Sequence, residues 1–200
     1  MSGNPAEAKE LLLDKIEQAA RAGVDCIQLR EKDLSGRELS ELASELLRRI
    51  GGRCLLLVNG RLDVALASGA DGIHLGECSL PLAEAKRLIG ERRTGANFVA
   101  GVSVHSLEAA RQAERDGTDY MIFGPVFATP SKAGFGAPQG LAKLREVSGA
   151  VKIPVIAIGG ITVENFRECL QAGAAGIAAI RLFQDSEDLP ALVSQLRSPY

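Results

Sequence analysis

The sequence predicts an α/β protein, a TIM-type (β/α) barrel whose first strand of eight is missing from the chain. Short apolar runs alternate with longer amphipathic stretches over the whole 200 residues. The clearest run covers 154–161, which is apolar on both faces and carries two glycines before Ile161. Such a run is typical of a parallel strand in a sheet covered by helices. Regular units without a break in composition predict one domain over residues 1–200.

Each expected strand is separated from the next by an expected helix. The strands are expected at 26–30, 54–58, 72–75, 98–104, 120–123, 154–161 and 176–180. The helices are expected at 7–22, 37–50, 61–68, 81–89, 106–116, 140–147, 162–172 and about 187–197. Ser106 and Thr162 stand at the starts of two of these helices as N-caps. A long loop at 125–139 follows the 120–123 strand.

A closed barrel is favoured over an open doubly wound sheet, because the Gly-x-Gly-x-x-Gly fingerprint of the open sheet does not follow the first strand. The chain offers only seven strands and begins with a helix, since MSGNPA cannot form a strand. A missing first strand leaves unpaired edges at 26–30 and 176–180, and unpaired edges invite association. We expect another segment, a partner chain or a collapse of the barrel to fill this seam, and we expect a homodimer.

Composition excludes several classes of protein. The net charge is −2 with both signs interspersed, which argues against a nucleic-acid-binding or membrane-surface protein. No apolar run approaches 18 residues and no charged leader precedes an apolar stretch, so we expect a cytoplasmic protein. The four cysteines form no Cys-x-x-Cys pair, which favours reduced thiols over disulfides or zinc.

Cations, small polar residues and glycines follow the expected strands. In β/α barrels the chemistry takes place at the carboxyl ends of the strands. The residues at these ends are Arg30, Lys32, Asn59, Glu77, Ser103, His105, Thr129, Lys132, Gly159, Gly160 and Arg181. We expect the four cations to converge although the chain is acidic overall, and phosphate groups would offset their repulsion.

Some of these residues also have a purely structural interpretation. Gly159 and Gly160 either serve a tight turn that needs glycine for its geometry, or bring backbone N–H groups close to a phosphate. His105 either caps a strand end or carries chemistry. His74, inside the expected 72–75 strand, is interpreted first as a hydrogen-bonded core histidine.

The motifs of the chain occur in a specific order. They are QLREK at 28–32, ADGIHLG at 70–76, GVSVHS at 101–106, FGPVF at 123–127, TPSK at 129–132 and IAIGGI at 156–161. Taken together, these motifs resemble the thiamin phosphate synthase family and its sister family, the thiazole tautomerases. The resemblance covers nearly the whole chain after Leu11. The family begins with a strand that this chain lacks.

The resemblance implies an enzyme of thiamin biosynthesis that joins hydroxymethylpyrimidine diphosphate to thiazole phosphate and releases pyrophosphate. It implies that Gln28, Arg30, Lys32 and Lys132 bind the diphosphate, that Asn59 and Ser103 lie near the pyrimidine, and that Gly159-Gly160 and the loop after Ile180 hold the thiazole phosphate. We therefore expect Arg30, Lys32, Ser103, His105 and Lys132 to be catalytic. We expect the substrate to be bound by Gln28, Asn59, Glu77, Thr129, Gly159, Gly160 and Arg181.

The chain departs from both sister families. The resemblance implies a Mg²⁺ cofactor, but Gly60 and Ser79 stand where the synthase has its two metal-binding Asp residues. Asp63 and Glu77 are nearby carboxylates with a different spacing, so we predict no metal ligands. Pro125 stands where the tautomerase has its His.

Three functions therefore stay open at this point. The first is synthase activity in which Arg181 and the lysines replace part of the positive charge of the metal. The second is a tautomerase-like isomerase in which His105, Glu77 or Cys78 moves the proton. The third is a non-catalytic protein that binds thiazole phosphate or thiamin phosphate.

Overall fold

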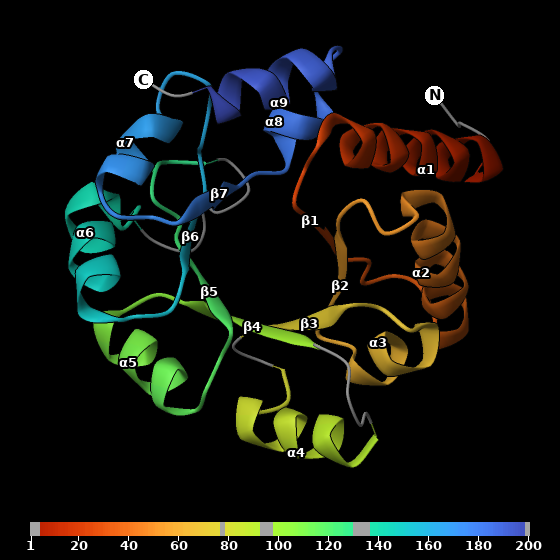
Figure 1. Ribbon diagram of the computed structural model, residues 1–200, viewed down its shortest axis with the longest axis horizontal. Coiled ribbons are helices and arrows are strands. Elements are labelled where there is room, and N and C mark those ends of the chain that lie inside the picture. The colour runs from red at the N-terminus through yellow and green to blue at the C-terminus, as the bar shows by residue number, and fades with distance from the viewer. Residues whose placement is uncertain (1–4, 77–78, 93–97, 130–136, 199–200) are drawn as a thin grey trace. The chain divides into compact units, whose positions relative to one another are not determined.

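A computed structural model of the chain describes residues 5–76, 79–92, 98–129 and 137–198 (Figure 1). The strands in these residues are β1 (Cys26–Leu29), β2 (Leu55–Asn59), β3 (Gly72–Leu75), β4 (Val99–Val104), β5 (Tyr120–Phe123), β6 (Val155–Ile158) and β7 (Gly176–Ala178). The helices are α1 (Pro5–Ala22), α2 (Gly36–Ile50), α3 (Leu62–Ser68), α4 (Leu82–Arg92), α5 (Leu107–Arg115), α6 (Gly140–Ala150), α7 (Phe166–Gln171), α8 (Arg181–Gln184) and α9 (Leu189–Arg197).

The sheet confirms the predicted α/β class. Among the described residues there are seven strands, and they form one sheet in the order β1-β2-β3-β4-β5-β6-β7. The pairs β1–β2, β4–β5, β5–β6 and β6–β7 are all parallel. The sequence order of the strands is therefore also their order in the sheet, as expected when a helix follows each strand. How the seam beyond β1 and β7 is filled stays a prediction.

The chain divides into two compact units. Unit 1 consists of residues 1–73 and 183–200, and unit 2 consists of residues 74–182. Strand β3 contributes residues to both units, because it runs from Gly72 to Leu75. The prediction of one domain over residues 1–200 stays a prediction.

In unit 1, helix α2 shows how the sequence specifies an element. Ser35 and Glu38 form a capping box at its start, and Gly51 ends it with a φ of 58°. Such a box satisfies backbone N–H groups that the first helical turn leaves without partners. The inward face of α2 buries residues spaced by three and four positions, namely Leu39, Leu42, Ala43, Leu46 and Ile50.

An ion network joins α1 to α2 within unit 1. The guanidinium of Arg49 on α2 binds Glu10 at 2.5 Å and Asp14 at 2.8 Å, both on α1, and Glu45 at 3.0 Å on its own helix. The Arg49 side chain is only 16% exposed, so water screens these contacts less than it screens ordinary surface pairs. Figure 1 shows α9 on the other side of α1, and the two helices pack together.

In unit 2, strands β4 to β6 form the buried centre. Met121 and Phe123 on β5 are fully buried. Figure 1 shows α5, α6 and α7 following one another along one side of these strands, and α5 packs on α6. The short, almost wholly apolar strands match the predicted pattern of a parallel sheet that is covered by helices.

The same type of hydrogen bond, from a strand amide to an aspartate side chain, occurs in each of the two units. In unit 1, Asp71 accepts a hydrogen bond from the backbone amide of Leu56 at 2.8 Å. In unit 2, Asp119 accepts one from the amide of Ala100 at 2.7 Å. Each aspartate stands just before a strand and binds the strand that precedes it in the chain. Asp71, which belongs to the motif at 70–76, and Asp119 therefore have a structural role.

Several predicted boundaries differ from the structure, and one short helix was not predicted. Thr162 does not cap a helix, because α7 begins at Phe166 after a turn in which the Thr162 hydroxyl accepts from the amide of Glu164. Strand β7 ends at Ala178, and Ile180 is 59% exposed. Helix α8 was not predicted, because four residues are too short for a hydrophobic period to appear. The N-cap prediction for Ser106 is confirmed, since its hydroxyl accepts from the amide of Ala109.

The predicted character of the cysteines agrees with their surroundings. Cys26, Cys54 and Cys169 are free thiols in the described part of the chain, and Cys78 lies outside it. Burial raises the pKa of Cys54 and of Cys169 to about 11, so both are neutral thiols near pH 7. No helix in the described ranges is both long enough and apolar enough to cross a membrane.

Candidate active site

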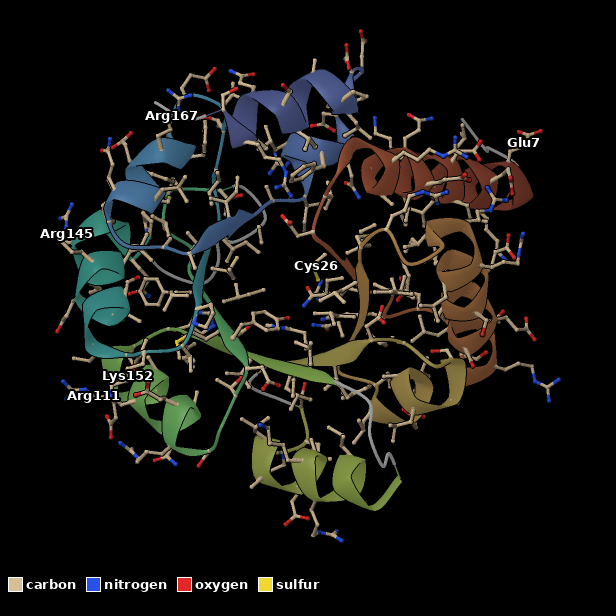
Figure 2. All side chains as sticks on the ribbon, in the orientation of Figure 1. Glu7, Cys26, Arg111, Arg145, Lys152 and Arg167 are labelled. Carbon is tan, nitrogen blue, oxygen red and sulfur yellow. The ribbon has the colours of Figure 1, made fainter. Side chains whose placement is uncertain are left out.

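The carboxyl end of β1 carries the predicted diphosphate ligands of unit 1, and the end of β2 carries Asn59, which is predicted to lie near the pyrimidine. Leu29 pairs with Val58, so Arg30 and Asn59 occupy neighbouring positions at the ends of the two strands. Gln28 is exposed on β1 and shares a face with Cys26, because side chains alternate along a strand. Figure 2 shows Cys26 on the face of the β1–β2 pair opposite α2.

Arg30 and Lys32 follow β1 and are both exposed. An exposed guanidinium at the end of a strand has its planar fork of N–H donors available to a bidentate anion. Because Gln28, Arg30 and Asn59 come from adjacent ends of one parallel pair, unit 1 brings an amide, a guanidinium and a second amide together. This arrangement is suited to an oxyanion.

In the segment after β2, the carboxylate of Asp63 forms an ion pair with Arg61. Gly60 has a φ of 70°, and the chain then places Arg61 beside Asp63. Nε and Nη2 of Arg61 donate to the two carboxylate oxygens of Asp63 at 2.9 and 2.6 Å. These hydrogen bonds hold the pKa of the Asp63 carboxyl below its usual value. Asp63 therefore already has a cationic partner.

The residues described at this end of the strands do not fit a magnesium ion. Ser79, at the second expected Asp position, closes a turn by accepting from the amide of Gly76 at 2.9 Å. The carboxylate of Asp63 is engaged by Arg61, and Asp71 precedes β3 at the opposite end of that strand, where it accepts from the Leu56 amide. No group of three or more His, Cys, Asp or Glu side chains suited to a metal occurs among the described residues. Magnesium prefers several carboxylate and water oxygens in octahedral geometry, and Glu77 lies outside the described residues.

In unit 2, Ser103 belongs to a chain of hydrogen bonds. Nε2 of His74 lies 2.9 Å from the Ser103 hydroxyl oxygen, and Nδ1 of His74 lies 2.9 Å from the Tyr120 hydroxyl. His74 is only 2% exposed, whereas Ser103 is half-buried. The interpretation of His74 as a hydrogen-bonded core histidine is confirmed. Its link to a predicted catalytic residue was missed, and so was Tyr120.

One signal in the sequence could have revealed Tyr120. Gly101 pairs with Tyr120 across β4 and β5. A Cβ atom on Gly101 would lie 2.0 Å from the Tyr120 ring, so the glycine makes the space that this ring occupies. A glycine inside a strand often marks such a close approach. The register that brings these two positions together is not visible in the sequence.

Because His74 is buried, its contribution to the free energy of unfolding depends on pH. Burial lowers its pKa from 6.5 to about 4, because the imidazolium would lose its hydration. The unfolded chain takes up this proton below pH 6.5, but the folded chain does so only near pH 4. The full stability is therefore present above pH 6.5, and it is lost as the pH falls toward 4.

We expect this effect to be absent in His74→Gln. Between pH 7 and 4, the unfolding free energy of the natural protein should fall by about 3 kcal/mol more than that of the variant. Urea unfolding monitored by circular dichroism at both pH values measures the difference. Equal losses in the two proteins would contradict a buried neutral imidazole.

His105 lies at the end of β4 and is oriented by the backbone. Its Nδ1 donates to the carbonyl oxygen of Gly124 at 2.6 Å, because a carbonyl oxygen can only accept a hydrogen bond. Val104 pairs with Phe123, so His105 and Gly124 follow at the same level. This bond gives His105 the capping role that was one of its two interpretations. Its assignment as a catalytic residue stays a prediction.

The turn at Gly159 and Gly160 is built against the segment after β5. The φ angles are 99° at Gly159 and 64° at Gly160. A Cβ at Gly159 would lie 2.5 Å from Cβ of Pro125, and one at Gly160 would lie 2.5 Å from the carbonyl oxygen of Ala128. The amide of Val126 also donates to Ile158 at 2.8 Å. The geometry by itself therefore requires glycine at both positions.

The same turn leaves backbone N–H groups available. The carbonyl of Gly159 accepts from Phe127, and that of Gly160 accepts from the side chain of Asn165. The amides of Gly159, Gly160 and Ile161 donate no hydrogen bond to another described residue. Consecutive N–H groups of this kind can surround an anion. Both interpretations of the Gly-Gly pair are thus compatible with the turn.

The remaining predicted residues are only partly described. Arg181 is exposed and begins α8 just beyond β7. Thr129 is half-buried, whereas Glu77 and Lys132 lie outside the described residues. Other cations of unit 2 are directed elsewhere, because Figure 2 shows Arg111, Arg145 and Arg167 pointing outward from α5, α6 and α7.

Known proteins are similar to this chain in sequence and in fold. Residues 3–183 match the family model described as thiamine monophosphate synthase. The thiamine-phosphate synthase of Chloroflexus aurantiacus is 45% identical over 186 residues, which cover 92% of this chain and 82% of that protein. The thiamine-phosphate synthase of Methanosarcina barkeri is 42% identical over 177 residues, covering 88% and 78%. The solved thiamine phosphate pyrophosphorylase of Pyrococcus furiosus matches with a TM-score of 0.81 and 38% identity over 92% of this chain and 87% of its own. The chain belongs to the thiamine monophosphate synthase family.

Proposed function

We propose that this protein is a thiamin phosphate synthase. It joins hydroxymethylpyrimidine diphosphate to thiazole phosphate and releases pyrophosphate. The observation that carries the proposal is the match to synthase relatives at 42–45% identity over about nine-tenths of the chain. The exposed Arg30 and Lys32 at the end of β1 supply the diphosphate-binding chemistry that this reaction requires.

The reaction breaks a carbon–oxygen bond and forms a carbon–nitrogen bond. The bond between the pyrimidine methylene and the diphosphate breaks first, and its electron pair leaves with the pyrophosphate. The thiazole nitrogen then donates its lone pair to the methylene cation, which gives thiamin phosphate. Negative charge grows on the departing pyrophosphate, so fixed cations that contact it lower the barrier. Arg30 and Lys32 perform this role, and Lys132 is proposed to join them.

The other ligands divide between the two substrates. Gln28 assists at the diphosphate, and Asn59 and Ser103 orient the pyrimidine through hydrogen bonds. The amides of Gly159, Gly160 and Ile161 bind the phosphate of the thiazole, together with Arg181 beyond β7. This assignment uses N–H groups that the described fold leaves available.

The family chemistry implies a magnesium ion. Mg²⁺ would neutralise pyrophosphate when bound, but Asp63, the carboxylate after β2, is already paired with Arg61. We propose that the arginine and lysine side chains carry that charge here. No step above passes through a metal.

The wider architecture is proposed on the same family grounds. The seven strands form a TIM-type barrel without its first strand, and the edges at β1 and β7 are covered in a cytoplasmic homodimer. An unpaired edge strand exposes N–H and C=O groups that another chain can bind. Size-exclusion chromatography with light scattering measures the oligomeric state, and a monomer would contradict the homodimer.

The test of the proposed function is a direct assay. The purified protein is mixed with both substrates, once with Mg²⁺ and once with a chelator, and thiamin phosphate is measured by chromatography. We expect product in both mixtures. Product only with Mg²⁺ would contradict the charge role of the side chains, and no product above the uncatalysed background would contradict the synthase itself.

Two further measurements distinguish the two alternative functions from a synthase that yields thiamin phosphate. A tautomerase would change the absorbance of the thiazole phosphate precursor without producing thiamin phosphate, and His105, Glu77 or Cys78 would be its proton-transferring residue. A non-catalytic binding protein would release heat on titration with thiazole phosphate and produce nothing. Neither outcome is compatible with a synthase.

A further inference from the structure

We propose that Tyr120 is a positioning residue that fixes the tautomer of His74 and thereby aims the hydroxyl hydrogen of Ser103 at the substrate. The Tyr120 hydroxyl donates to Nδ1 of His74, and the proton on Nε2 of His74 is donated to the Ser103 oxygen. The catalytic consequence rests on the proposed synthase function. The hydrogen-bond arrangement itself stands on the geometry of unit 2.

The three side chains come from three strands and form one continuous chain. His74 lies on β3, Ser103 on β4 and Tyr120 at the start of β5. Both links measure 2.9 Å, which is an ordinary hydrogen-bond length. His74 has no room to turn away, because it is 2% exposed.

The position of the Tyr120 ring is set from both sides. Its ring lies over Gly101, where a Cβ would approach it to 2.0 Å. The Thr118 hydroxyl interacts with the carbonyl oxygen of Tyr120 at 2.8 Å and with that of Ala100 at 2.9 Å. Two neighbouring strands therefore hold the backbone of Tyr120, and Gly101 leaves the ring one place to lie.

The direction of the two hydrogen bonds follows from acidity. A neutral imidazole has one N–H donor and one acceptor nitrogen, so one hydroxyl must donate to it and the other must accept. The tyrosine phenol, with a pKa of about 10, is far more acidic than the serine alcohol and is the better donor. Tyr120 therefore donates to Nδ1, and Ser103 accepts from Nε2.

This direction leaves the hydroxyl hydrogen of Ser103 unused by His74. That hydrogen can be donated to an acceptor such as a ring nitrogen of the pyrimidine. In the opposite tautomer the Ser103 hydrogen would point at His74, and Ser103 could offer only lone pairs to the substrate. The burial that lowers the pKa of His74 to about 4 keeps the ring neutral, as this arrangement needs.

A purely packing role for Tyr120 makes a different prediction. The rings of His74 and Tyr120 lie 5.6 Å apart at an angle of 36°, so they also contact each other as rings. Tyr120→Phe keeps this contact and removes only the hydroxyl. If Tyr120 serves packing alone, the variant should keep both the tautomer of His74 and the affinity for the substrate.

The first arm of the test is spectroscopic. The chain has only two histidines, so long-range ¹H–¹⁵N spectra of the imidazole rings can be assigned with a His105→Gln variant. We expect the natural protein to carry the His74 proton on Nε2 and an unprotonated, hydrogen-bonded Nδ1. In Tyr120→Phe the Nδ1 resonance should shift or the two tautomers should mix. A proton on Nδ1 in the natural protein would overturn the proposal.

The second arm measures binding without turnover. Calorimetric titration with the pyrimidine diphosphate should give an affinity about tenfold weaker in Tyr120→Phe, which is the loss expected for one misdirected hydrogen bond. Thiazole phosphate should bind both proteins equally. Unchanged affinity for the pyrimidine diphosphate would reduce Tyr120 to a packing residue.

The two arms also separate this inference from the proposed function. A protein that shows the expected tautomer and affinities but forms no thiamin phosphate would contradict only the synthase reaction. A protein that forms thiamin phosphate but carries the His74 proton on Nδ1 would contradict only the role of Tyr120. Unchanged His105 signals in Tyr120→Phe serve as the control for an intact fold.

Discussion

Replacing Arg30 by Ala should lower kcat/KM for thiamin phosphate formation by about 100- to 1,000-fold, the usual effect of removing one donor from a developing anion. The guanidinium follows β1 and is exposed at the end of the strand, level with Asn59 on β2. Without the guanidinium, the departing pyrophosphate loses the contact with a fixed positive charge and with two parallel N–H donors. Steady-state release of pyrophosphate measures the change.

Companion variants separate charge from geometry. Arg30→Lys should recover only part of the activity, because an ammonium group is a point charge without a planar fork. Lys32→Ala should also lose activity. Arg111→Ala removes the same charge as Arg30→Ala from the outer surface of α5, and it should leave the rate unchanged (Figure 2). Equal losses in Arg30→Ala and Arg111→Ala would attribute the effect to net charge and contradict the site.

Replacing Gly159 by Ala should destabilise the protein by about 3 kcal/mol, from a left-handed backbone and an overpacked contact together. The φ of Gly159 is 99°, and the new Cβ would lie 2.5 Å from Cβ and 2.6 Å from Cα of Pro125. The proline ring cannot move aside as a flexible side chain would. Urea unfolding measures the loss, with an unchanged dependence on denaturant if the fold is kept.

Gly149 supplies the matched control for this variant. It lies inside α6, and no atom would come within 4 Å of a Cβ placed there. Gly149→Ala should stabilise the helix by about 0.5–1 kcal/mol, because alanine loses less backbone entropy on folding. If Gly159→Ala were as mild as Gly149→Ala, the turn after β6 would not be held against Pro125 as described.

The periodic elements could be predicted because the hydrophobic pattern is local. Apolar runs and turn glycines located all seven described strands, and the Ser106 cap was readable from one hydroxyl before a helix. The start of α7 was missed, because the choice between Thr162 and Asn165 depends on the hydrogen bonds of the turn that precedes the helix. Such bonds form only when the chain leaves β6 in one direction.

For the candidate site too, some features could be predicted from the sequence and others could not. The sequence alone determined which residue types follow each strand, since the carboxyl end of a strand is defined by the strand itself. It also located the departures at Gly60 and Ser79, which made a magnesium site doubtful before any geometry was known. Local spacing was sufficient for the residue types, whereas the departures were recognised through the resemblance to the synthase family.

Only the tertiary structure decided which side chains act on one another. It joined Tyr120 to His74 and His74 to Ser103 across three strands. It also assigned the carboxylate of Asp63 to Arg61. Registers between strands and the space opened by Gly101 create these contacts, and neither depends on the order of residues within one segment. The sequence by itself therefore determined the strands and the family, whereas packing between strands decided how the residues at their ends are aimed.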